Sequence, residues 1–216
     1  AGNFGNVFAG YVAAQMGLPV ERLIIASNRN DILPRFFASG AMARESVVPS
    51  LSPSMDIQVS SNFERLLFEL MDRDGVAVAG IMDRFAETGR FELPDSAKKA
   101  AHRHYSAYRL DDAGTLAEIA ASMETDGMCL DPHSAVGVSA ARRAIADGTV
   151  AADIPVVALA CAHPAKFGAA VSKATGTTPA LPPHLADLMQ RPEKMAKADA
   201  SAAAVRDLVL EKWRRG

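Results

Sequence analysis

Apolar residues recur every three to four positions in several stretches of the chain, and this spacing predicts helices with one buried face. In residues 5–16, Phe8, Tyr11 and Val12 share such a face, and Gly17 stands where a glycine ends a helix. The predicted helices cover residues 5–16, 32–39, 63–70, 76–88, 95–108, 112–124, 134–146, 164–174 and 202–214. Asn62 is the expected N-cap of the third. In the last, the apolar residues expected to face inward are Val205, Leu208, Val209 and Trp213.

Three compact apolar runs lack polar alternation, which is typical of strands in a parallel sheet that is covered on both faces. They are residues 22–26, 127–130 and 156–161. Residues 91–93 predict one further extended piece, and the prolines and serines of residues 46–61 predict a loop. Strands separated by helices of this length indicate an α/β fold with three layers and a mostly parallel sheet. We expect residues 1–216 to form one domain, or the greater part of a larger one.

The composition indicates a folded chain and limits the classes of partner that it is expected to bind. Of the 216 residues, 49% are hydrophobic and 22% are charged, with a formal net charge of −2. This balance argues against disorder and predicts neither a nucleic-acid partner nor a membrane partner. The longest apolar run, residues 156–162, is much shorter than the about 20 residues that span a bilayer. Cys129 and Cys161 lie in predicted strands, which favours buried thiols in a reducing cytoplasm.

The chain opens with a glycine-rich turn, Gly2-Asn3-Phe4-Gly5-Asn6, which leads directly into the first predicted helix. Glycines let backbone N–H groups turn toward a ligand, and the start of a helix adds partial positive charge. Together these features suit an anion such as a phosphate ester. A tight turn without a ligand is the alternative. Because such a turn normally follows a strand, we also expect that an upstream segment is missing from this sequence.

Two polar clusters follow the second and third predicted strands, where α/β proteins bind ligands. A small polar side chain at Cys161 could bond a ring nitrogen, and His163 and Lys166 are further candidates. In the alternative, these three serve the core, the turn and the surface. After the other strand, Asp131 either orients His133 as a base or ligand, or caps the next helix.

A third polar cluster, residues 28–31, follows the first predicted strand, and residues 52–57 and 60–65 supply further polar loop positions. Loops at strand ends concentrate substrate contacts, whereas solvated turns and helix caps are the alternative. His102 and His104 are expected at the surface, and no other histidine or cysteine stands at metal-ligand spacing. The chain also lacks a G-x-S-x-G elbow. We therefore predict no metal site and no Ser-His-Asp triad.

Taken together, these stretches resemble the threonine synthases, pyridoxal 5′-phosphate enzymes of the tryptophan-synthase-β type (fold type II). The resemblance rests on GNFGNVFAGYVAAQMGLPVERLIIASNRNDIL, SPSMDIQVSSNFERLLFEL, LDPHSAVG and CAHPAKF, in this order over residues 2–167. The SNFERLLF stretch separates threonine synthases from their dehydratase and cysteine-synthase relatives. No motif is recognised after Phe167.

The resemblance assigns roles to individual residues. The backbone amides that hold the cofactor's phosphate would be those of Gly2, Asn3, Phe4, Gly5 and Asn6. Cys161 falls where the family usually has a threonine whose hydroxyl meets the pyridine nitrogen. A thiol is a weaker hydrogen-bonding group than a hydroxyl, so this contact departs from the family pattern.

The resemblance also implies a reaction, the conversion of O-phospho-L-homoserine and water to L-threonine and phosphate. In the family, the lysine that forms a Schiff base with the cofactor precedes the glycine-rich turn. It has no counterpart here, because Lys98, Lys99 and Lys166 stand in other contexts. Residues 1–216 would then be the C-terminal part of the large domain, with no catalytic residue and no activity in isolation. The alternatives are a non-catalytic module that binds a phosphorylated ligand, a structural piece with an empty site, and another lyase of the same fold.

Overall fold

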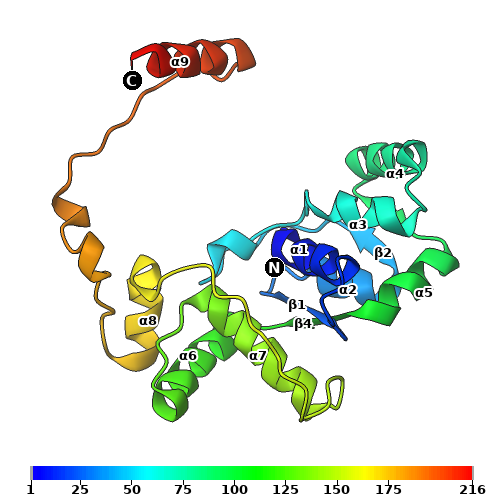
Figure 1. Cartoon of the computed structure of the whole chain (residues 1–216), viewed down its shortest axis with the longest axis horizontal. Helices are drawn as coiled ribbons and strands as arrows, with labels where there is room; N and C mark the ends of the chain where they lie inside the picture. The colour runs from blue at the N-terminus through cyan, green and yellow to red at the C-terminus, as the bar shows by residue number, and fades with distance from the viewer. Residues whose placement is uncertain (1, 216) are drawn as a thin grey trace. The chain divides into compact units, whose positions relative to one another are not determined.

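The computed structural model describes residues 2–215 (Figure 1). Two compact units divide the chain, Ala1–Ala180 and Leu181–Gly216, and each is described by itself. The helices and strands of the first unit are α1 (Gly5–Gln15), β1 (Leu23–Ser27), α2 (Ile32–Ser39), β2 (Ala41–Ala43), α3 (Phe63–Leu70), α4 (Gly75–Thr88), β3 (Arg90–Glu92), α5 (Asp95–His104), β4 (Tyr105–Arg109), α6 (Asp112–Asp126), α7 (Pro132–Ala146) and α8 (Gly168–Thr175). The second unit contains α9 (Ala202–Arg215).

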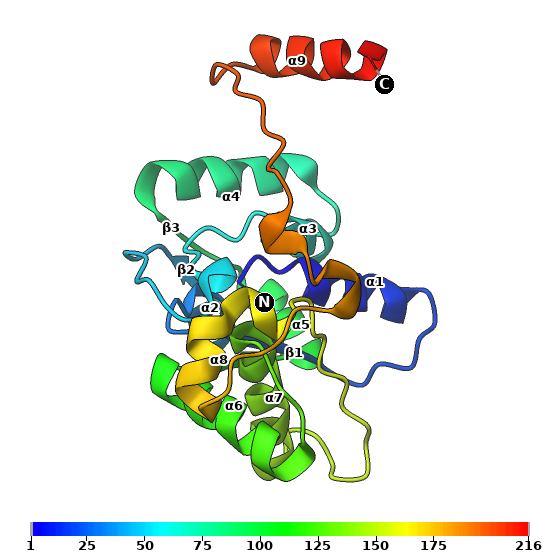
Figure 2. The same cartoon turned by 90° about the vertical axis from the view of Figure 1, so that its left-hand side faces the viewer.

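A parallel pair of strands, β1 and β4, lies at the centre of the first unit, with Leu23 opposite Tyr105. Ile25 points to one face, where it joins a buried cluster with residues of α1 and α2. Ala26 points to the other face, where it packs with Val136 of α7. Figures 1 and 2 show α1 and α7 on opposite sides of the two strands. The predicted α/β class, with helices on both faces of a parallel sheet, is confirmed.

Two smaller assemblies complete the first unit. Strands β2 and β3 pair antiparallel, with Met42 opposite Phe91, which confirms the short extended piece predicted there. Helices α6, α7 and α8 surround a separate buried cluster that contains Ile119, Leu130 and Ala135. The predicted helices other than the one over residues 95–108 are confirmed within a few residues, although residues 164–167 form a 3₁₀ turn before α8.

One predicted helix is wrong at its end. The helix that begins at Asp95 stops at His104, and Tyr105–Arg109 forms β4 instead of the last helical turn. The physical reason is long-range pairing: Tyr105 is buried against Phe4 and Phe37, while the backbone of β4 completes the ladder of β1. Tertiary contacts of this kind override the local helical pattern.

Two predicted buried strands are also wrong. Residues 127–130 form no strand, because Gly127 adopts a left-handed conformation (φ 63°) that ends α6, and only Leu130 is buried. Residues 156–161 are likewise outside any strand, and Val157 and Leu159 are 80% and 62% exposed. No strand in the described part of the chain pairs with either run, so their backbone groups have no ladder to join.

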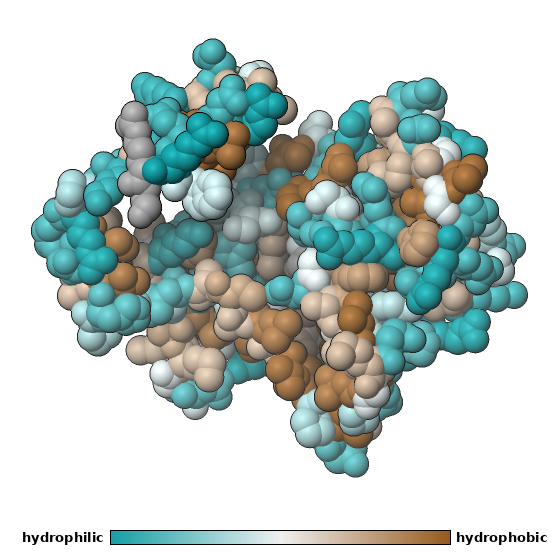
Figure 3. All heavy atoms as spheres, turned by 45° about the horizontal axis from the view of Figure 1, so that its top comes forward, coloured by the Kyte–Doolittle hydropathy of each residue, from teal (hydrophilic) through white to brown (hydrophobic). Residues whose placement is uncertain are grey.

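Exposure corrects three further expectations. Cys161 is exposed and Cys129 is half-buried, so neither thiol lies in the core as predicted, and both are free. In α9, Val205, Val209 and Trp213 are 50%, 60% and 79% exposed rather than inward. Figure 3 shows that hydrophobic residues occur at the surface among polar ones. Within residues 2–215, no helix is both long enough and apolar enough to cross a bilayer.

Candidate functional site

The glycine-rich turn brings several backbone N–H groups to one place. Phe4 adopts the left-handed conformation (φ 60°, ψ 1°), and the right-handed helix α1 begins at the next residue. This alternation forms a nest, in which successive N–H groups converge on one point. The N–H groups of Gly5, Asn6 and Val7 also belong to the first helical turn, and none of them finds an acceptor among the described residues. They are therefore available to an anion.

The strained conformation of Phe4 is held in place by its side chain. A left-handed residue other than glycine costs roughly 1–2 kcal/mol. The Phe4 ring is fully buried and lies 5.2 Å from the ring of Phe63 in an edge-to-face arrangement. The rings of Phe37 and Tyr105 lie 6.4 Å and 6.0 Å away. Burial of a phenylalanine ring contributes about 1.5–3 kcal/mol, which is enough to offset the strain.

The turn is also clamped by the two loop segments that carry the SPSMDI and SNFER motifs. A Cβ atom on Gly2 would lie 2.9 Å from the Cα atom of Met55, so only glycine fits there. The side-chain Oδ1 atom of Asn3 accepts hydrogen bonds from the N–H and the Oγ of Ser61, at 2.8 Å and 3.0 Å. The segment over residues 52–61 thus holds both Gly2 and Asn3, the two residues that precede the nest.

The structure brings Cys161 to the glycine-rich turn even though its predicted strand is absent. The side-chain Nδ2 of Asn6 donates to the Sγ of Cys161 over 3.0 Å. All the residues predicted to bind the cofactor, from Gly2 to Asn6 together with Cys161, therefore lie around the start of α1 within the described structure.

Asp131 both caps the next helix and orients the His133 ring. The Asp131 carboxylate accepts from the N–H groups of His133 and Ser134 and so caps α7. It also contacts the Oγ of Ser134 and the Nδ1 of His133, the latter at 2.9 Å. Burial alone would raise the pKa of Asp131, but these hydrogen bonds outweigh it and hold the pKa below its usual value.

His133 links three motif segments and is not free to act as a base. Its Nε2 accepts from the N–H of Ser54 at 3.1 Å, so the ring proton lies on Nδ1, where it is donated to Asp131. The His133 ring also lies 4.6 Å from the ring of Phe167. The imidazole therefore holds together the segments SPSMDI, LDPHSAVG and CAHPAKF.

His163 and Lys166 take the structural positions considered as an alternative. The Nδ1 of His163 accepts from the N–H of Ala165 at 3.2 Å and so caps the 3₁₀ turn Pro164–Phe167. Lys166 is exposed, with its Nζ 5.5 Å from the Phe167 ring centre. Within the described residues, neither side chain forms a hydrogen bond or an ion pair with the glycine-rich turn.

The cluster after β1 is buried rather than solvated, which corrects the alternative of a solvated turn. Asn28 and Asn30 are each 1% exposed. Their Nδ2 atoms donate to the Oδ1 of Asp56 at 2.7 Å and 2.8 Å. Because Asp56 belongs to the SPSMDI segment, this network holds that segment at the carboxyl end of β1. It thereby also places Met55 against Gly2.

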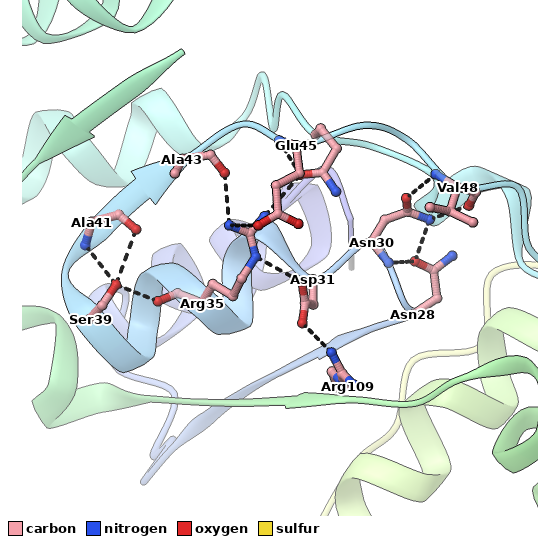
Figure 4. Close-up of polar contacts among 11 residues, drawn as sticks. Asn28, Asn30, Asp31, Arg35, Ser39, Ala41, Ala43, Glu45, Val48 and Arg109 are labelled. Carbon is pink, nitrogen blue, oxygen red and sulfur yellow. Dashed lines mark hydrogen bonds and ion pairs between the residues drawn. The ribbon is translucent and has the colours of Figure 1, made fainter. Parts of the chain in front are cut away.

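Asp31 joins the same edge of the sheet to β4 (Figure 4). Its carboxylate bonds Arg35 of α2 and Arg109, the last residue of β4, each at 2.9 Å. Sequence reasoning singled out residues 28–31 but missed Arg35 and Arg109. Arg35 stands four residues after Asp31, a spacing at which side chains on a helix pair, so a local signal for it existed. No local signal marks Arg109, which is 78 residues from its partner in sequence.

A cavity of about 460 Å³ lies elsewhere, where α1 ends and β1 begins. Tyr11, Arg22 and His104 are among its lining residues, and no residue of the glycine-rich turn is. No group of three or more His, Cys, Asp or Glu side chains suited to a metal occurs among residues 2–215.

These observations define an α/β protein with a nest of N–H groups and a buried polar network gathered at the carboxyl end of a parallel strand pair. The family model described as "Threonine synthase, C-terminal" matches residues 134–209. Threonine synthase of Pseudomonas aeruginosa is 46% identical over 216 residues, which cover 100% of this chain and 45% of that protein.

Solved structures agree with the sequence comparison. The crystal structure of pyridoxal-phosphate-bound threonine synthase from Brucella melitensis is 47% identical, with a TM-score of 0.87 over 98% of this chain and 44% of that one. Threonine synthase from yeast is 35% identical, with a TM-score of 0.87 over 100% of this chain and 47% of that one. The chain therefore belongs to the threonine synthase family, and it spans less than half the length of these relatives.

Proposed function

We propose that this chain supplies the phosphate end of the pyridoxal 5′-phosphate site of a threonine synthase. The single observation that carries the proposal is the nest at residues 4–6, whose N–H groups have no acceptor among the described residues. The Brucella melitensis relative, which is 47% identical, is described as bound to pyridoxal phosphate. The amides of Gly2, Asn3, Phe4, Gly5 and Asn6 would hold the phosphate, and Cys161 would face the pyridine nitrogen.

The proposed reaction is the conversion of O-phospho-L-homoserine and water to L-threonine and phosphate. When bound, the cofactor supplies an electron sink at the reacting carbons. The residues of this chain would bind and orient the cofactor. The nest fixes a dianionic group, the Asn3–Ser61 bonds keep the turn in position, and the Asn6 side chain holds Cys161 beside it. None of these side chains is assigned a proton-transfer role.

We further propose that the lysine to which the cofactor is attached is not among residues 1–216, and that the chain alone does not turn over substrate. Such a lysine needs a lowered pKa to act as a nucleophile. The hydrogen bond from Lys98 to Glu92 raises the pKa of Lys98 instead. Residues 1–216 would form part of one larger domain with the site at its border. The free thiols at Cys129 and Cys161 favour the cytoplasm as the compartment.

A direct test combines the purified chain with pyridoxal 5′-phosphate and with O-phospho-L-homoserine. The expected result is phosphate-dependent, reversible binding, seen by ³¹P NMR, without covalent attachment in the visible spectrum and without release of phosphate. Turnover by the chain alone would refute the assignment of the lysine. Absence of any binding would refute the phosphate site. Binding of unrelated phosphate esters with equal affinity would favour the alternative of a non-catalytic phosphate-binding module.

A further inference from the structure

The segment Ser60–Asn62 lies against the glycine-rich turn and carries polar groups that the fold does not use. Ser61 is committed, since its N–H and Oγ both donate to Asn3. Ser60 is only 6% exposed, and its hydroxyl has no hydrogen-bond partner within the described structure. A buried hydroxyl without a partner is costly, because it has lost its hydrogen bonds to water.

The side chain of Asn62 is a second polar group in this segment that the fold leaves unused. It occupies the N-cap position of α3, where an asparagine side chain ordinarily accepts from a backbone N–H, yet it forms no such bond. Its Nδ2 atom instead lies 3.5 Å from the position that a Cβ atom on Gly5 would occupy. The amide is therefore beside the first residue of α1, where the nest is formed, and is free to donate there.

We propose that Asn62 donates a side-chain N–H to the anion held by the backbone N–H groups of residues 4–6. This inference rests on the proposed function and deepens it, because it adds a side-chain donor to a site otherwise built from backbone. A phosphate monoester has three strong acceptor oxygens, more than one nest saturates. Asn62 serves an oxygen that the backbone leaves exposed, and the ligand class is a phosphate monoester.

The decisive variant is Asn62→Asp in the full 216-residue chain. Aspartate has the same shape but replaces the N–H donors by a negative charge, and it is a good N-cap, so α3 should remain folded. The probes are inorganic phosphate and pyridoxal 5′-phosphate, followed by ³¹P NMR, with the melting temperature from circular dichroism as the readout of folding. We expect at least tenfold weaker binding of both probes and an unchanged or raised melting temperature. Glu87→Gln, an exposed change on α4, is the control and should bind as the original chain does.

The outcomes separate this inference from the proposed function. If the original chain binds phosphate and Asn62→Asp binds it equally well, the role of Asn62 is overturned while the phosphate site stands. If the original chain binds neither probe, both are overturned. Should Asn62→Asp fail to fold, Asn62→Ser retains a capping hydroxyl but lacks the amide. For Asn62→Ser, affinity equal to that of the original chain overturns the inference, and a tenfold loss supports it.

Discussion

Two apolar runs of similar composition differ in structure: one forms a buried strand and the other forms no strand. Leu23–Ser27 forms β1, pairs with β4 and buries Ile25 completely. Residues 156–161 form no strand, and Val157 is 80% exposed. The difference lies in the partner and not in the run: β1 has a ladder at Tyr105–Arg109, and the second run has none among the described residues. An apolar pattern thus indicates that a segment can be buried, whereas the presence of a neighbouring strand decides whether it is.

The largest effect on the free energy of unfolding is expected from a pair of variants that compares the two runs directly. Ile25→Ala removes a fully buried side chain and should lower the free energy of unfolding by about 2–5 kcal/mol. Val157→Ala, at an exposed position, should stay within about 0.5 kcal/mol of the original chain. Urea unfolding measures both. A loss at Val157 as large as that at Ile25 would show that the second run is packed after all.

The glycine-rich turn provides the next test of close packing. In Gly2→Ala the added Cβ atom would lie 2.9 Å from the backbone of Met55, so the turn must shift, at a cost of about 1–3 kcal/mol. In Gly5→Ala the nearest atom would be 3.5 Å away, an ordinary contact, and alanine is the better helix former. Thermal unfolding should therefore show a lower melting temperature for Gly2→Ala only. Equal melting temperatures would mean that the turn is not clamped by residues 52–61.

Asp131 bonds the His133 ring, which lies against Phe167 of the CAHPAKF segment, and a substitution of Asp131 tests this connection. Asp131→Asn should cost about 1–3 kcal/mol at pH 7, because it weakens the bonds to His133 and Ser134. The pKa of Asp131 is lowered in the folded chain. Its stabilising contribution is therefore present above the ordinary aspartate pKa near 3.9 and lost as the pH falls through the lower folded value.

Unfolding in urea at pH 7 and at pH 3 measures this difference. The difference in free energy of unfolding between the original chain and Asp131→Asn should be smaller at pH 3 than at pH 7. A difference that stays constant with pH would mean that the carboxylate is not the source of the stabilisation.

The smallest effect on stability is expected at Cys161. Because Cys161 is exposed and Cys129 is half-buried, a thiol reagent should label Cys161 first. Cys161→Ser should abolish the fast phase of labelling, Cys129→Ser should leave it intact, and both should melt within a few degrees of the original chain. Slower labelling of Cys161 than of Cys129 would restore the sequence-based view of a buried thiol.

The elements with strong local signals could be predicted from the sequence. Helix α2 is confirmed between Ile32 and Ser39, with Gly40 in the left-handed conformation (φ 73°) at its end, because the apolar spacing and the glycine both act locally. The glycine-rich turn was likewise recognisable, since its glycines and the helix after it are adjacent in sequence.

What could not be predicted depends on contacts between distant residues. β4 follows a polar helix without a glycine or proline between them, and its partner β1 lies about 80 residues earlier. The buried network of Asn28, Asn30 and Asp56 looks like a solvated turn in sequence, because nothing local shows that three polar side chains satisfy one another. Only the assembled fold reveals which polar residues are inside.

The phosphate site is tested by a titration of the ¹⁵N-labelled chain with inorganic phosphate and with pyridoxal 5′-phosphate, followed through the backbone amide resonances. We expect the amide signals of Phe4, Gly5 and Asn6 to shift most and to saturate together with each probe. Shifts concentrated at the cavity lined by Tyr11, Arg22 and His104, with the signals of residues 4–6 unchanged, would contradict the proposed phosphate site.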